Sequence, residues 1–229
     1  PFARTTNVHT LEEAMKGCDV FIGLSKGGVV SPAMLKSMAD KPIVFAMANP
    51  DPEIDYTTAV NARPDIIMAT GRSDFPNQVN NVLGFPYIFR GALDVRATQI
   101  NEVMKLAAVR ALAELAKSPV PDLVNMAYDE KVIVFGPEYI IPKPMDPRLI
   151  STVSIAVAKA AIESGVARKI ITDWDAYAME LENRLGLDHY LFRAISARAR
   201  KDPRRVVFAE ADNARVLKAA QIARDEGLA

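Results

Sequence analysis

Two adjacent asparagines, Asn80 and Asn81, have the residue type and position that point most directly to chemistry. They follow an expected strand end and open an expected helix within residues 75–86. In open α/β sheets, ligands bind outside the carboxyl ends of strands, and helix N-termini offer unpaired backbone N–H groups. A side-chain amide donates and accepts without charge, which suits a carboxamide or a carboxylate of a ligand. Helix capping explains either asparagine as well, and both interpretations stay open.

Two other loops that follow expected strands carry further candidates. Asn49 ends the second apolar run, where such sheets present residues to ligands. A turn residue ahead of Pro50 is the simpler interpretation of it. Residues 23–28, which include Gly23 and Ser25, are rich in glycine, so that a ligand can approach the backbone closely. They match neither the Rossmann fingerprint nor a P-loop, and an ordinary strand-to-helix loop is the simpler interpretation.

A proline-rich stretch, residues 137–147, contains one cationic side chain and is followed directly by another. Lys143 and Arg148 have the charge to bind a phosphate or a carboxylate. The alternative, which we prefer, is that Arg148 pairs with Asp146 while the prolines stiffen a surface connection.

Other ionisable residues give weaker signals. Asp51, Glu53 and Asp55 alternate with prolines, and we interpret them as a solvated turn rather than a cation site. The two histidines, His9 and His189, have no acidic or thiol neighbour at metal-binding spacing, so a zinc site is not expected. The sequence shows neither a serine nucleophile elbow nor a cysteine–histidine pair.

These candidates require a scaffold, and the hydrophobic pattern predicts one. Apolar runs and helical patterns alternate over the first 75 residues, as in βαβ units around a parallel sheet. Strands are expected at residues 19–24, 42–48 and 65–70, with helices at 11–15, 31–38 and 56–62. Longer helices are expected at residues 80–95, 101–116, 149–164, 173–185 and 189–200. A strand at 205–209 and a helix at 213–223 then restart the pattern.

The fold class is therefore α/β. We expect part of a Rossmann-like, doubly wound parallel sheet with helices on both faces, a helical linker, and the first βα unit of a second α/β domain. The expected boundaries are residues 1–185, 186–203 and 204–229. The chain begins at Pro1 without an initiator Met and stops directly after a helical pattern, so we expect an internal piece of a longer protein.

Composition excludes several classes of partner. Lys plus Arg and Asp plus Glu balance at 28 each, so no long-range field gathers nucleic acid or an anionic membrane. A single cysteine excludes an intramolecular disulfide, and the sequence contains neither a signal peptide nor a membrane-spanning apolar run. A cytoplasmic location is expected.

Five blocks of the sequence, in order, resemble consecutive blocks of malic enzymes. Residues 19–25, 42–53 and 76–86 carry the resemblance to the family, and residues 90–97 and 135–148 narrow it to the bacterial type. It covers residues 1–185. The run from Arg205 to Gln221 is similar to the start of the phosphotransacetylase-like domain that one group of bacterial malic enzymes carries.

The resemblance implies oxidative decarboxylation of L-malate to pyruvate and CO2, with reduction of NADP or NAD and assistance from Mg or Mn. It implies that Asn49 and Asn81 bind substrate, and that Gly23, Ser25, Asn49, Asn80 and Asn81 border the cofactor. The catalytic acid–base pair and the metal ligands are expected upstream of Pro1, so no residue here is a catalytic or metal-ligand candidate. The chain alone is expected to be inactive.

Further implications are a homo-oligomer and an acetyl-CoA effector that acts through the second domain. The rival hypothesis is a non-catalytic regulatory or oligomerisation module with a degenerate dinucleotide site. Asn49 and Asn81 argue against it, because a site without a ligand has no need of both amides.

Overall fold

The computed structural model divides into two compact units, Pro1–Glu182 and Asn183–Ala229. It describes residues 5–128, 132–185, 198–209, 212–225 and 227–228. Within these residues, no helix combines the length and the apolar character needed to cross a membrane.

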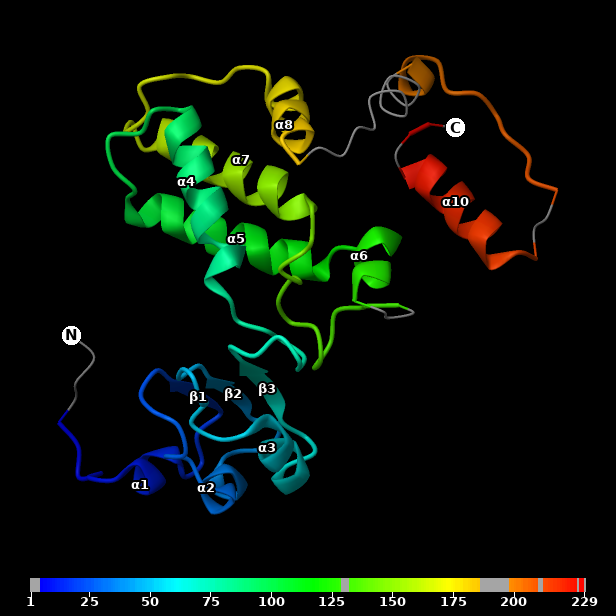
Figure 1. Cartoon of the computed structure of the whole chain (residues 1–229). Helices are drawn as coiled ribbons and strands as arrows, with labels where there is room; N and C mark the ends of the chain where they lie inside the picture. Colours follow the sequence, from blue (N-terminus) through cyan, green and yellow to red (C-terminus); the bar gives the residue numbers. More distant parts are fainter. Residues whose placement is uncertain (1–4, 129–131, 186–197, 210–211, 226, 229) are drawn as a thin grey trace. The chain divides into compact units, whose positions relative to one another are not determined.

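The first part of the larger unit is a three-stranded parallel sheet (Figure 1). Its strands are β1 (Val20–Gly23), β2 (Ile43–Ala46) and β3 (Ile67–Thr70). β2 lies in the centre and pairs with both neighbours, with Phe21 opposite Val44 and Val44 opposite Met68. This order confirms the prediction of an α/β fold around a parallel sheet.

Three short helices connect and cover these strands: α1 (Leu11–Met15), α2 (Pro32–Ser37) and α3 (Tyr56–Ala62). Each begins at a side chain that accepts a backbone N–H of the first turn, and these caps are Thr10, Ser31 and Asp55. Such caps satisfy donors that have no partner inside the helix. Local sequence therefore determines where each helix begins.

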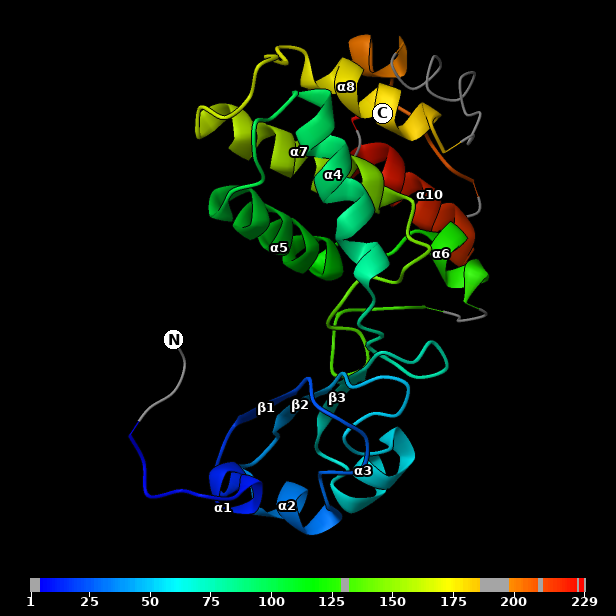
Figure 2. The same cartoon turned by 60° about the vertical axis from the view of Figure 1, so that its left-hand side comes forward.

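The helices α1 to α3 lie on one side of the strands in both views (Figures 1 and 2). On that side, Phe21, Val44 and Met68 share a face of the sheet and contribute to one apolar core. Val20 and Ile22 belong to the opposite face and are 48% and 63% exposed. The helices described against this sheet therefore cover one face.

The second part of the larger unit is helical and has a core of its own. Its described residues form a short 3-10 helix, η1 (Asn81–Leu83), followed by five α-helices. They are α4 (Phe85–Asp94), α5 (Glu102–Lys117), α6 (Asp122–Ala127), α7 (Arg148–Glu163) and α8 (Trp174–Asn183). α7 packs against both α4 and α5, and its buried side chains form the centre of the core.

The helix expected over residues 80–95 is interrupted. The chain forms η1, passes Gly84 and begins α4 at Phe85, with Pro86 in its first turn. Proline has no backbone N–H and its ring clashes with the preceding turn, so it is tolerated at a helix start but not in an interior. The short α6 was not predicted, because its six residues show no clear helical period.

The smaller unit contains α10 (Ala214–Asp225), which agrees with the helix expected at residues 213–223. The strand expected at residues 205–209 is not formed there. A strand is stabilised by hydrogen bonds to a neighbour, and no partner strand is described beside this segment. Most of the helix expected at residues 189–200, including His189, lies outside the described residues.

Close packing of α4 on α7 gives a testable prediction at Gly91. A Cβ atom there would lie 2.4 Å from the Ser154 carbonyl oxygen and 3.0 Å from the Val157 Cβ. Because the nearest atom is backbone, the helices would have to separate. We expect Gly91→Ala to lower the free energy of unfolding by about 2 kcal/mol, the usual cost of overpacking. Urea unfolding against Gly84→Ala, whose Cβ would meet Ile88 at an ordinary 3.6 Å, measures it.

Candidate functional site

The candidate site lies where the three parallel strands end. β1, β2 and β3 end at Gly23, Ala46 and Thr70, which lie opposite one another in the register of the sheet. Their carboxyl ends therefore share one edge of the sheet (Figure 1). This edge is the usual ligand-binding position of open α/β sheets.

Asn49 lies between the ends of β2 and β3. Its side chain is exposed and makes no hydrogen bond to any residue that the structure describes. A Cβ atom at Gly71 would come within 3.3 Å of the Asn49 Oδ1 and 3.9 Å of the Val79 carbonyl oxygen. The absence of a side chain at Gly71 thus leaves room for the amide beside the segment that leads to Asn80.

The two adjacent asparagines have different environments. Val79 donates its backbone N–H to the Thr70 carbonyl over 2.8 Å, which holds Asn80 next to the end of β3. The Asn80 Oδ1 accepts the Val82 N–H at 3.0 Å and caps η1, so the capping interpretation is confirmed for this residue. Asn81 is exposed, and its amide has no hydrogen-bond partner among the described residues. Of the two adjacent asparagines, only Asn80 therefore uses its side-chain oxygen within the described residues.

The prediction for Glu53 was wrong. We expected a solvated turn, but its side chain is completely buried. One carboxylate oxygen accepts the Ser25 N–H at 2.8 Å and the other accepts the Ala48 N–H at 3.0 Å. Paired backbone donors offset the cost of burying a charged group. Alternation with prolines gave no sign of this, because the donors come from segments before it in the chain.

The neighbouring carboxylates behave differently from Glu53. Asp55 caps α3 by accepting the Thr58 N–H at 3.0 Å, and Asp51 is exposed. No group of three or more His, Cys, Asp or Glu side chains is placed to hold a metal ion within the part of the chain that the structure describes.

Gly23 and Ser25 lie beside this buried carboxylate. A Cβ atom at Gly23 would be 2.4 Å from the Glu53 Cδ, so the glycine leaves space for the acid. The Ser25 N–H already donates to Glu53, and its hydroxyl lies 3.5 Å from the same oxygen. A buried negative charge behind the loop disfavours a phosphate there. The loop is suited to an uncharged part of a ligand.

Asn77 was not predicted, yet it connects two distant segments. It is buried, with φ of 54°, and its amide donates to the carbonyls of Met68 and Pro137 at 3.0 and 2.7 Å. Its Oδ1 accepts the Ile140 N–H at 2.9 Å. Asparagine tolerates the left-handed region better than most residues, and its position after Pro76 was an available turn signal. Its role is structural support near β3.

The charged groups of the proline-rich stretch also have structural partners. Asp146 is buried and pairs with Arg148 over 2.6 Å, as the preferred interpretation predicted. Arg148 additionally donates to the Pro119 carbonyl at 2.7 Å. The Lys143 ammonium lies 4.8 Å from the centre of the Tyr128 ring. These contacts account for the cations without a phosphate.

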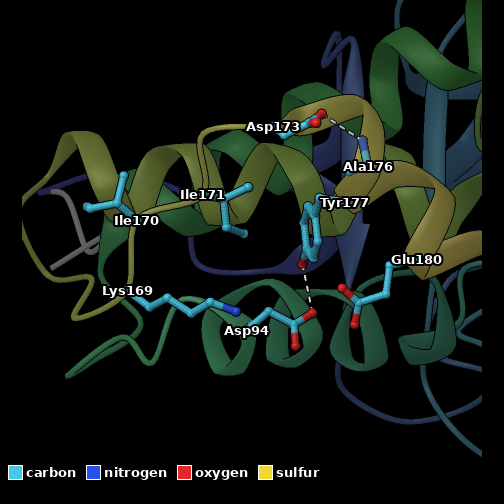
Figure 3. A pocket seen from close by; sticks show the side chains of 8 residues that line it. All are labelled: Asp94, Lys169, Ile170, Ile171, Asp173, Ala176, Tyr177 and Glu180. Atoms are coloured by element: carbon cyan, nitrogen blue, oxygen red, sulfur yellow. Dashed lines mark hydrogen bonds between the residues drawn. The ribbon is translucent and has the colours of Figure 1, made fainter.

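A separate pocket of about 220 Å³ lies where α8 approaches the end of α4 (Figure 3). Its lining consists of Asp94, Lys169, Ile170, Ile171, Asp173, Ala176, Tyr177 and Glu180. The Tyr177 hydroxyl donates to Asp94 at 2.8 Å, and Asp94 also pairs with Arg90. Burial, followed by the bond to Asp94, raises the pKa of Tyr177. The pocket is too small for a dinucleotide, and its tyrosine and aspartate attach α8 to α4.

Comparison with known proteins shows the family of this chain. Residues 2–126 match the family model described as the NAD binding domain of malic enzymes. The chain is 56% identical over 94% of its length to the NADP-dependent malic enzyme of Rhizobium meliloti (strain 1021), covering 28% of that protein. It is 50% identical over its whole length to the NAD-dependent malic enzyme of the same organism, covering 30% of it.

A solved structure that is similar to this chain is also a malic enzyme. The malic enzyme of Entamoeba histolytica superposes with a TM-score of 0.67 at 36% identity, over 96% of this chain and 42% of that one. With coverages of 28% and 30%, the chain spans less than a third of the length of the two Rhizobium meliloti relatives. The matched residues include the ends of all three strands and both asparagine segments. The chain belongs to the malic enzyme family, and its residues 2–126 match the NAD-binding domain of that family.

Proposed function

We propose that this chain supplies the dinucleotide-binding part of an enzyme that converts L-malate to pyruvate and CO2 while reducing NADP or NAD. The observation that carries the proposal is the exposed Asn49 amide at the shared edge of the strands, without a partner among the described residues. Relatives that carry the names NADP-dependent and NAD-dependent malic enzyme, at 56% and 50% identity, support it.

The described residues fit a role in binding and orientation. Asn49 and Asn81 each offer an NH2 donor group and an acceptor oxygen, which match the carboxamide of a nicotinamide, and the NH2 group alone suits the carboxylate of malate. Gly23 and Ser25 border the uncharged end of the cofactor, and Asn80 holds the backbone that presents Asn81. Such fixed contacts lower the entropic cost of bringing two reactants together.

The bound dinucleotide would accept a hydride from C2 of malate. The described residues do not fit a divalent cation, since they offer no group of three or more ligand side chains. We propose that Mg2+ or Mn2+ takes its ligands from other segments of the full-length protein. The contribution of this chain is to hold malate and the nicotinamide side by side.

The test is malate-dependent reduction of NADP and of NAD by the full-length protein that carries this chain, with Mn2+ present and pyruvate measured as product. Formation of pyruvate supports the proposal, and the ratio of the two rates identifies the preferred cofactor. A folded protein that binds a dinucleotide without oxidising malate would instead favour the rival hypothesis of a regulatory module.

A second proposal concerns the smaller unit. We propose that the segment from Arg205 begins a phosphotransacetylase-like domain through which acetyl-CoA regulates malate oxidation. Its support is the likeness of that segment's sequence to such domains, together with the helix α10.

Truncation of the full-length protein after Asp202 is expected to leave malate oxidation measurable, because the site residues all precede the cut. The same truncation is expected to abolish any change of rate on addition of acetyl-CoA. Steady-state rates with and without acetyl-CoA measure both effects. A response retained by the truncated protein would place the effector site elsewhere.

A further inference from the structure

The carboxylate of Glu53 connects the two loops that carry candidate ligand-binding residues. Its Oε1 accepts from Ser25, in the loop after β1, and its Oε2 accepts from Ala48, directly before Asn49. The backbone of the same segment adds two bonds, from the Gly28 N–H to the Pro52 carbonyl and from the Val30 N–H to the Glu53 carbonyl. The ends of β1 and β2 are thus joined at one buried point.

Glu53 has no route to a bound ligand. Its side chain is 0% exposed, whereas Ser25 and Asn49 are exposed. Any effect of Glu53 on turnover must therefore pass through the backbone that it holds. Backbone support of this kind matters because a catalytic contact tolerates displacement of only a fraction of an ångström.

We propose that Glu53 is a positioning residue that fixes the Asn49 amide for hydride transfer by anchoring the segment before Asn49 to the Gly23–Ser25 loop. This inference rests on the proposed function. It explains why an acid is present, since two N–H donors face two different oxygens and only a carboxylate accepts at both. Glutamine has one acceptor oxygen and would turn its NH2 group toward one of the two donors.

Glu53→Gln in the full-length protein is the first test, because it preserves size and removes one acceptor. We expect kcat/KM for malate to fall about tenfold, with a change of roughly 1.4 kcal/mol in transition-state stabilisation. The matched control is Asp55→Asn, two residues along the chain. The Asp55 carboxylate caps α3 at an exposed position, and asparagine can cap a helix as well. The substitution should therefore leave kcat/KM within about twofold of the wild-type value.

A double-mutant cycle separates positioning from general stability. If Glu53 acts through Asn49, Glu53→Gln introduced into an Asn49→Ala protein should cost less than about twofold. A merely structural role predicts that the tenfold loss persists in the Asn49→Ala background, and that result would overturn the proposal. Unchanged kinetics in the single variant would overturn it as well.

Glu53→Asp provides a second variant in case the glutamine protein does not fold. Aspartate keeps both acceptor oxygens, so it should recover part of the activity that glutamine loses, and the same cycle with Asn49→Ala applies to it. An aspartate variant whose loss is additive with Asn49→Ala counts against the proposal.

The wild-type protein distinguishes this inference from the proposed function. Absence of malate oxidation in the folded wild type overturns the proposed function alone. Titration of the fluorescence of NADPH or NADH, whichever the wild type binds, then tests Glu53 independently of turnover. Binding should weaken in Glu53→Gln and not in Asp55→Asn, and equal binding by both variants would overturn the inference.

Discussion

Gly23→Ala is expected to lower the free energy of unfolding by about 3 kcal/mol, the upper part of the range for overpacking a buried site. The new Cβ would lie 2.4 Å from the Glu53 Cδ and 2.5 Å from its Oε1. The carboxylate cannot retreat without losing the Ser25 N–H, and a buried charge that loses its donor is costly. Malate oxidation should fall with stability, because the displaced acid holds both loops of the site.

Urea unfolding and steady-state kinetics on the full-length protein measure this effect. Gly136→Ala is the matched control, because its Cβ would meet only the Val134 carbonyl oxygen, at 4.0 Å. The cause is tested by adding Gly23→Ala to a Glu53→Ala protein, in which the colliding carboxylate is absent. The alanine at position 23 should then cost less than about 1 kcal/mol. An undiminished cost would place the strain on Phe21, whose ring is the next contact.

The elements of the sheet could be predicted because their signals are local. Ser31 and Asp55 precede their helices in positions where a capping side chain accepts a first-turn N–H, and the structure shows both bonds. The apolar runs of β1, β2 and β3 needed no partner to be recognised. By contrast, the strand expected at residues 205–209 is not formed, because a strand requires a neighbour that periodicity alone does not supply.

Some features of the candidate site could also be predicted from the sequence, and others could not. That Asn49, Asn80 and Asn81 follow strand ends could be read from the order of elements, as could the pairing of Asp146 with Arg148. The burial of Glu53 could not, because it depends on a glycine 30 positions earlier and on two backbone donors brought together only by the fold. Tertiary support of a site leaves little trace in one sequence.

The distinction between the two adjacent amides leads to the prediction at Asn81. Asn81→Ala in the full-length protein is expected to lower kcat/KM for malate by one to two orders of magnitude, roughly 1.4 to 2.7 kcal/mol. The physical reason is the loss of a polar contact to the reacting partners, since this exposed amide has no partner among the described residues. Removing it leaves protein hydrogen bonds intact, so the unfolding free energy should stay within about 0.5 kcal/mol.

Asn80→Ala gives the informative comparison. It removes the acceptor for the Val82 N–H, and loss of such a cap costs about 1 kcal/mol of stability. Its kinetic effect should be smaller than that of Asn81→Ala, because it acts through the position of η1. Asn61→Ala, at an exposed site in α3, controls for loss of an amide elsewhere. If the two adjacent substitutions had equal kinetic effects, the shared backbone rather than the Asn81 amide would be what the ligand requires.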